Sequence, residues 1–148
     1  MNHYDQIKYI LYNNEFSHKF LVKYAYECAM YANSLVPNPK SQAVKCLDLV
    51  KQWLDGKPVS KNELELAAYA GYAAADYAAA NAADAASYAA NAAANAYAAA
   101  ANAAADAADA YADANKSYET GIKHCYDILI NMITEMSELE KLLLNIKV

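Results

Sequence analysis

The sequence predicts an all-α protein, a bundle of five to seven helices in which long Ala-rich helices pack closely. Apolar residues recur at spacings of three and four along both ends of the chain, which is the helical period. Between them, residues 67–114 contain 31 alanines in 48 positions, and alanine has the highest helix propensity. No strand pattern is present. We expect one domain, 1–148, with N-terminal helices in 1–56, Ala-rich helices in 60–114 and C-terminal helices in 116–148.

Residues 1–56 contain three apolar stripes at helical spacing, so we expect three helices there. Asn13-Asn14 separates the first stripe from the second, and Pro37 and Pro39 end the second helix. Ser41 is expected to cap the third helix, and Gly56 to end it in the left-handed conformation. The stripes consist of Tyr4, Ile7, Ile10 and Leu11; of Phe20, Leu21, Tyr24, Cys28, Tyr31 and Leu35; and of Val44, Leu47, Val50, Trp53 and Leu54.

The Ala-rich tract opens at Ser60-Lys61-Asn62-Glu63, which has the spacing of a capping box. A single helix over 67–114 would be about 72 Å long. A compact chain of this length has a radius of gyration near 15 Å, so we expect at least two helices. We place the break between Asn81 and Tyr88, where polar side chains can cap.

Polar and aromatic residues follow one face of this tract in steps of three and four, which indicates a structured surface. Its members are Tyr77, Asn81, Asp84, Tyr88, Asn91 and Asn95, then Asn102, Asp106, Asp109 and Asp113.

The C-terminal part predicts two further helices. A second capping-box spacing, Ser137 to Glu140, separates a long helix from a short terminal one. The long helix carries an apolar stripe of Ile122, Tyr126, Leu129, Ile133 and Met136, and the short one contains Leu142, Leu143 and Ile146.

The net charge is −5, and all twelve basic residues are lysine. Arginine is the usual bidentate ligand of phosphate and guanine, so this acidic chain is not expected to bind nucleic acid. Lysine can still hold a phosphate as a point charge, which leaves small nucleotides open as ligands.

Cys28, Cys46 and Cys125 form no CxxC pair, and their odd number favours buried thiols in a reducing compartment. The first residues lack the apolar run of a signal peptide. Residues 85–105 are uncharged and long enough to span a bilayer, but they contain no Leu, Ile, Val or Phe. We therefore expect no membrane span and a cytoplasmic protein, in a bacterial cell or a phage-infected host.

The block CLDLVKQWLDGKPVSKNELELAAYAGYAAADYAAANAADAA, Cys46 to Ala86, resembles the Ala-rich, all-helical immunity protein family of bacteria and phages. The shared features are a helix that ends near Trp53, a turn with Gly56, and a long Ala-rich segment with recurrent aromatic and acidic residues. The resemblance implies an all-α protein that neutralises a target by binding, without catalysis.

Motifs for catalysis or cofactors are not found. His3, His18 and His124 form no metal-ligand spacing, and three glycines cannot build a Gly-rich phosphate loop. His124 and Cys125 are neighbours, and we expect one to be exposed and the other buried. The acids at the end of the stripe favour a solvated face over a carboxylate site. We expect no enzyme, no cofactor and no metal.

Fourteen tyrosines leave two interpretations open, rings that seal the core or a recognition surface of rings and amides. The candidate ligand- or partner-binding residues are Tyr77, Asn81, Asp84, Tyr88, Asn91, Asn95, Tyr97, Asn102, Asp106 and Asp109.

The function that we expect is a non-catalytic, stoichiometric antagonist of a toxin or defence factor, of the immunity-like or phage anti-defence type. One alternative is a small-molecule sponge that sequesters a nucleotide immune signal. A second is a structural or ice-binding helical protein, although its usual threonines are present only at Thr120 and Thr134. The expected partner is a protein target or a small nucleotide-like ligand, and a homo-oligomer is open.

Overall fold

A computed structural model gives the structure of the protein and describes residues 2–35, 41–66, 105–109 and 118–148. These residues form helices, without a strand among them, which confirms the all-α prediction. No helix within these ranges is long and apolar enough to cross a membrane. The break of the Ala-rich tract and the close packing of its helices lie outside the described residues.

The labelled helices are α1 (His3–Tyr12), α2 (His18–Ser34), α3 (Ser41–Leu54), α7 (Tyr118–Glu135) and α8 (Glu138–Leu144). Residues 61–66 and 105–109 are helical as well.

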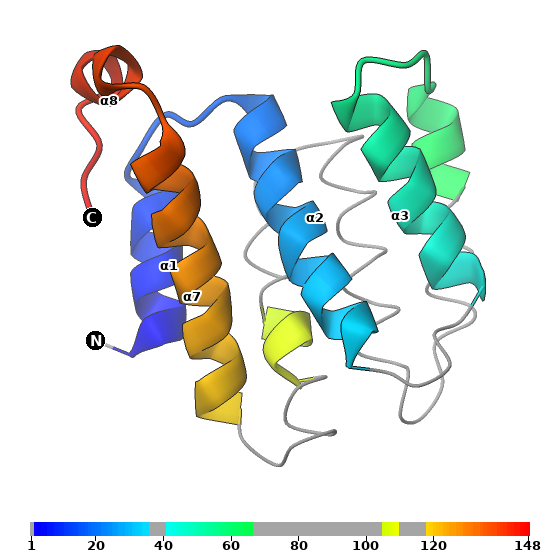
Figure 1. Ribbon diagram of the computed structural model, residues 1–148, viewed down its shortest axis with the longest axis horizontal. Helices are drawn as coiled ribbons and strands as arrows, with labels where there is room; N and C mark the ends of the chain where they lie inside the picture. Colours follow the sequence, from blue (N-terminus) through cyan, green and yellow to red (C-terminus); the bar gives the residue numbers. More distant parts are fainter. Residues whose placement is uncertain (1, 36–40, 67–104, 110–117) are drawn as a thin grey trace.

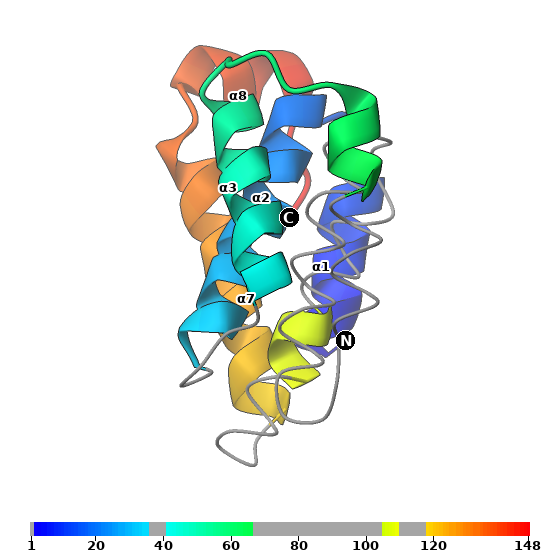
Figure 2. The ribbon, with the colours of Figure 1, turned by 90° about the vertical axis from the view of Figure 1, so that its right-hand side faces the viewer.

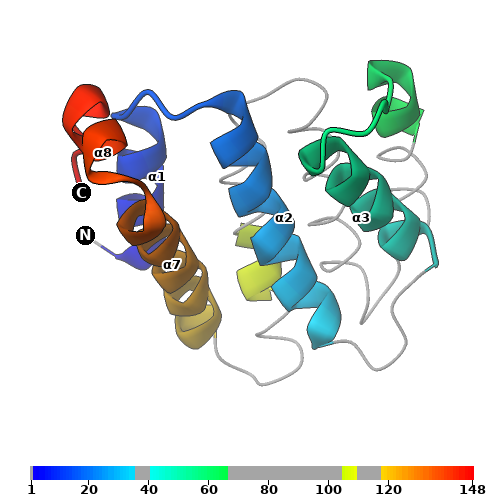
Figure 3. The same cartoon turned by 45° about the horizontal axis from the view of Figure 1, so that its top comes forward.

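The helices pack in a spatial order that differs from their order in the chain. Helix α1 packs against α7, α7 against α2, and α2 against α3 (Figure 1). Figure 2 shows α2, α3 and α7 on one side of the molecule, and α1 with residues 105–109 on the other. Both ends of the described chain lie beside α1 (Figure 3). The N-terminal and C-terminal helices therefore form one body.

Side-chain caps begin four helical segments. Asn2 Oδ1 accepts a hydrogen bond from the Asp5 amide at 2.8 Å, and Ser17 Oγ accepts one from the Phe20 amide at 3.1 Å. Two predicted caps are confirmed, because the Glu63 amide donates to Ser60 Oγ at 3.0 Å and the Glu140 amide donates to Ser137 Oγ at 3.1 Å. Ser41, the third predicted cap, is the first residue of α3. These bonds satisfy amide groups that have no partner inside the helix.

Helix α3 ends in a Schellman motif. The Gly56 amide donates to the Trp53 carbonyl at 3.1 Å, and the Lys57 amide donates to the Gln52 carbonyl at 2.9 Å. Gly56 has a φ of +80°, as the sequence predicted. A side chain with a Cβ is strained in this conformation, which explains why glycine stands here.

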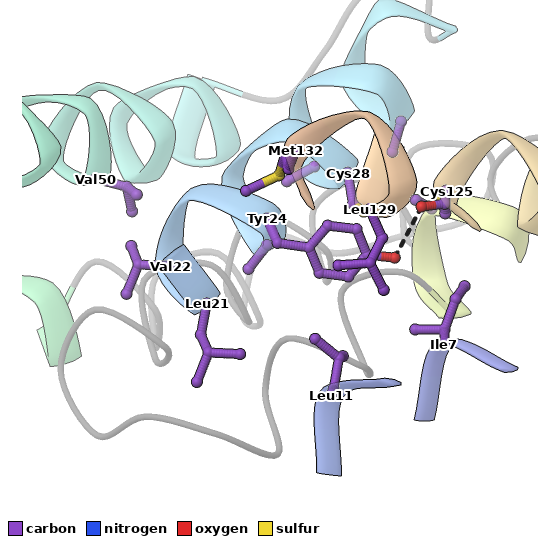
Figure 4. Close-up of a cluster of buried hydrophobic side chains, with 14 of the residues drawn as sticks. Ile7, Leu11, Leu21, Val22, Tyr24, Cys28, Val50, Cys125, Leu129 and Met132 are labelled. Carbon is purple, nitrogen blue, oxygen red and sulfur yellow. Dashed lines mark hydrogen bonds between the residues drawn. The ribbon is translucent and has the colours of Figure 1, made fainter. Parts of the chain in front are cut away.

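The core centres on Tyr24, which is completely buried between α2 and α7. Its hydroxyl donates to the Cys125 carbonyl at 2.9 Å (Figure 4). Burial, with the nearby Cys28 and Cys125 thiols, holds the pKa of Tyr24 well above its ordinary value. All three cysteines are buried thiols, as predicted. The predicted stripe residues that lie in the core include Ile7, Ile10, Leu11, Leu21, Cys28, Leu47, Val50, Ile122, Leu129 and Ile133.

One prediction for α3 is wrong. Val44, expected on the buried face, is 42% exposed. The helix turns Ala43 and Cys46 inward together with Leu47 and Val50, so the buried face is rotated away from Val44.

Asn14 fixes the end of the chain to the turn between α1 and α2. Its Nδ2 donates to the Lys147 carbonyl and to the Ile10 carbonyl, both at 2.7 Å. The Lys147 amide donates back to Asn14 Oδ1 at 2.6 Å. Because Asn14 is buried, its side-chain amide supplies the hydrogen bonds that water would otherwise make to the backbone of Ile10 and of Lys147.

Alkaline pH is expected to destabilise the fold. Burial raises the pKa of both Tyr24 and Cys28, so the unfolded chain releases these protons at a lower pH than the folded chain. This stabilisation is complete below the unfolded pKa values and is lost as pH rises from about 9 through the folded values. Urea unfolding at pH 8, 10 and 11 should show a falling free energy of unfolding. Tyr24→Phe should reduce this fall, and an identical pH dependence in both proteins would contradict the assignment.

Candidate functional site

Most of the predicted Tyr/Asn/Asp stripe lies outside the described residues. Of its candidate residues, Asp106 and Asp109 are described, and both are half-buried in the helical segment 105–109. They flank Ala107 and Ala108, which are completely buried in the core. Burial, and then the Asp109 carboxylate, raises the pKa of Tyr118 to about 12. This acidic part of the stripe therefore contacts the bundle. The predicted residues outside the described ranges are Tyr77, Asn81, Asp84, Tyr88, Asn91, Asn95, Tyr97 and Asn102.

A groove between α2 and α3 is the strongest candidate site in the described structure. It has a volume of about 310 Å³, at the lower limit of typical small-molecule sites. One face of α2 and one face of α3 form its two walls, since the two helices lie side by side (Figure 1). The residues that line this α2–α3 groove are Tyr26, Met30, Asn33, Ser34, Val44, Leu47 and Asp48.

The groove lining includes two large apolar side chains that remain exposed, one from each helix. Met30 is 43% exposed on α2, and Val44 is 42% exposed on α3. Leu47, which also lines the groove, is buried. A partner that covers these exposed apolar groups is stabilised by roughly 25 cal/mol for each Å² of apolar surface removed from water.

The charge around the groove is predominantly negative. The hydroxyl of Tyr26 is partly buried, and that burial is the main cause of its raised pKa. The carboxylates of Glu27, Asp48 and Asp55 add to the increase, while the Lys51 ammonium opposes it. Lys51 Nζ in turn donates to the Asp55 carboxylate at 3.0 Å. With Lys51 paired to Asp55, the carboxylates of Glu27 and Asp48 remain near Tyr26 and favour a cationic partner at this site.

Two polar groups of the groove lining are held in place by α2 itself. Asn33 Nδ2 donates to the Ala29 carbonyl at 2.9 Å, and Ser34 Oγ donates to the Tyr31 carbonyl at 2.6 Å. These bonds restrict the rotamers of both side chains. A partner would therefore not have to order these groups.

The sequence contains a signal for the groove that periodicity analysis of the core overlooked. Tyr26, Met30 and Asn33 recur at spacings of four and three, which forms a second stripe on α2 beside the buried one. Val44, Leu47 and Asp48 have the matching spacing on α3. The spacing pattern does not predict the distance between α2 and α3, and the groove depends on that distance.

The histidines of the described structure serve as packing groups. The His124 ring stacks on Tyr31 with centroids 3.8 Å apart, and the His18 ring lies 5.2 Å from that of Trp53. His124 is exposed and Cys125 is buried, as the sequence predicted. Among the residues that the structure describes, no group of three or more His, Cys, Asp or Glu side chains could hold a metal ion.

Asp48 is the one carboxylate among the described lining residues, and the Ser34 hydroxyl in the same lining donates its hydrogen bond to the Tyr31 carbonyl. Comparison with known proteins found no matching family model, no matching curated protein and no matching solved structure.

Proposed function

We propose that the protein is a non-catalytic binding protein that acts as a stoichiometric antagonist of a basic protein target, a toxin or a defence factor. The observation that carries this proposal is the α2–α3 groove, whose lining combines exposed Met30 and Val44 with the carboxylate of Asp48. Apolar contacts supply affinity, and opposite charges guide the encounter and exclude acidic competitors. The overall charge of −5 extends the same preference over the whole molecule.

The groove favours this function over a sponge for a nucleotide signal. A nucleotide brings phosphate groups, which need cationic or amide donors. Lys51 is already bonded to Asp55, and Glu27 and Asp48 would repel a phosphate. The apolar walls suit a protein side chain, such as a long aliphatic or basic one.

The Ala-rich tract belongs to the same proposal. The resemblance of Cys46–Ala86 to the immunity protein family supports neutralisation of a target by binding. We propose that the Tyr/Asn/Asp stripe of this tract adds contacts of the kind that recognition loops use. Tyr88→Ala and Asn95→Ala test this contribution separately from the groove.

Affinity capture with matched variants tests the site. The double variant Met30→Ala/Val44→Ala removes the two exposed apolar side chains and leaves the buried residues intact. Wild-type protein should retain one basic protein from a bacterial lysate, and the double variant should weaken its binding at least tenfold, because central apolar anchors each contribute more than about 1 kcal/mol. Asp48→Asn should slow association and reduce its salt dependence.

Leu142→Ala is the matched control, since Leu142 is 77% exposed on α8 and does not line the groove. This variant should capture the same basic protein as the wild type. The proposed site would be contradicted if the wild type, Met30→Ala/Val44→Ala and Leu142→Ala bound the captured partner equally. Capture of an acidic partner would contradict it as well.

A further inference from the structure

Two hollows lie on either side of Tyr9, away from the α2–α3 groove. The outer hollow has a volume of about 450 Å³ on α1, and the inner hollow has about 440 Å³ between α1 and α7. The outer one is lined by Asp5, Lys8, Tyr9, Tyr12 and Asn13, and the inner one by Gln6, Tyr9, Ile10, Tyr126 and Val148.

Tyrosine rings dominate the exposed part of both hollows. Tyr9 is 41% exposed and Tyr12 is 58% exposed, although both stand on a helix that buries Ile7, Ile10 and Leu11 on its other side. The Tyr126 ring lies half-buried on α7, and its centroid is 5.2 Å from that of His3. Two tyrosines from different helices thus line the inner hollow, and planar ligands stack on such rings.

The polar groups of the inner hollow match the edge of a heteroaromatic ring. Gln6 carries an amide donor and an amide acceptor side by side, and this pair complements an adjacent donor and acceptor on a nucleobase edge, such as the amino group and a ring nitrogen of adenine. Ile10 provides an apolar surface beside them. This combination of one amide, two rings and an aliphatic group is typical of sites that orient a planar ligand.

The charges near Tyr9 argue against an anionic ligand. Lys8 Nζ lies 4.7 Å from the centroid of the Tyr4 ring and 3.8 Å from the Asp5 carboxylate. Its charge is therefore engaged by two neighbours on its own helix. A ligand in the inner hollow has little to gain from carrying a phosphate, and the net charge of −5 opposes one.

Asn14 positions the wall of the inner hollow. It holds the backbone of Lys147 through two hydrogen bonds, of 2.6 and 2.7 Å, and Val148 follows directly as a lining residue. Asn14 thus ties the backbone next to Val148 to the bundle, while Val148 itself is 67% exposed.

We propose that the inner hollow between α1 and α7 binds an uncharged, planar heteroaromatic ligand of the nucleobase or nucleoside class. The ligand stacks on Tyr9 and Tyr126, and its hydrogen-bonding edge meets the Gln6 amide. The site is independent of the α2–α3 groove, so either one can fail without the other.

Calorimetric titration with adenine, adenosine and adenosine monophosphate tests the site and separates its possible ligands. Adenine or adenosine should bind in a ratio of one to one, and the monophosphate should bind more weakly. Tyr9→Leu should weaken binding about tenfold or more, because loss of stacking on one base has an effect of that size. Tyr9→Phe keeps the aromatic ring and should retain binding. The difference between Tyr9→Phe and Tyr9→Leu therefore measures the contribution of stacking on the ring. Gln6→Leu should weaken nucleoside binding and leave binding of indole, which lacks the matching edge, unchanged.

Met30→Ala is the control outside the site and should bind adenosine like the wild type. No binding of adenine or adenosine at millimolar concentration would overturn the proposal. Tighter binding of the monophosphate, or equal binding by Tyr9→Leu, would do the same.

Discussion

Tyr24→Ala is expected to lower the free energy of unfolding by about 3–5 kcal/mol, the range for removal of a buried aromatic side chain. Tyr24 is completely buried where α2 meets α7, so its loss leaves a cavity that the neighbouring helices cannot fill. It also removes the hydrogen bond to the Cys125 carbonyl, which spans 101 positions of the chain. Because small domains are stable by about 5–15 kcal/mol, this variant should be close to unfolding at room temperature. Urea denaturation followed by far-UV circular dichroism measures the change.

Tyr24→Phe isolates the hydroxyl from the ring. This variant keeps the packing and loses one buried hydrogen bond, so it should cost about 1 kcal/mol. If Tyr24→Ala were no more destabilising than Tyr24→Phe, the ring would not be the centre of the core.

Asn14→Ala is expected to lower the free energy of unfolding by about 2 kcal/mol or more. The substitution removes the partner of the Lys147 amide and two bonds to carbonyl groups, of Ile10 and Lys147. Each buried polar group that loses its partner costs about 1–3 kcal/mol. The C-terminal residues should also detach, since no other side-chain bond in the described structure ties Lys147 to the bundle. Hydrogen exchange at the Lys147 amide and urea unfolding measure both effects.

Asn13→Ala is the matched control for Asn14→Ala. Asn13 is exposed, and its side chain donates to the Tyr9 carbonyl at the end of its own helix at 2.8 Å. Its replacement should cost less than about 1 kcal/mol and leave the Lys147 amide protected. Equal effects of the two substitutions would show that the buried contact with Lys147 contributes nothing.

Helix identity and many helix ends could be predicted because they depend on local chemistry. Apolar spacing of three and four placed Leu21, Tyr24 and Cys28 on one buried face of α2. The hydroxyls of Ser60 and Ser137 cap the amides three residues later. These features require no knowledge of neighbouring helices, which is why the sequence is sufficient for them.

Features that depend on two distant segments could not be predicted in the same way. Val44 is apolar and has core spacing, yet the rotation of α3 against α2 exposes it. The partner of Asn14 lies 133 positions away, so a local pattern describes Asn14 as part of a break between helices. The α2–α3 groove and the hollow beside Tyr9 likewise arise from the separation of two helices.

The predicted recognition surface of the Ala-rich tract stays a prediction, because most of its residues lie outside the described ranges. Tyrosine, amide and acidic side chains were expected to form the recognition surface of the Ala-rich tract. The described structure places the same kinds of groups on α1, with Tyr9, Gln6 and Asn13, and on the α2–α3 groove, with Tyr26, Asn33 and Asp48. Composition indicates which groups are abundant, but only packing decides which of them border a hollow.

A titration of the captured basic partner tests the central claim most directly. Increasing amounts of the protein are added to a fixed amount of the partner, and the partner's activity is recorded at low and at high salt. A stoichiometric antagonist should reduce the activity linearly until it is lost at one equivalent, and Met30→Ala/Val44→Ala should need a large excess. Loss of activity at a small fraction of one equivalent would indicate catalysis, and an unchanged activity at several equivalents would show that binding does not antagonise the partner. Either result would contradict the account.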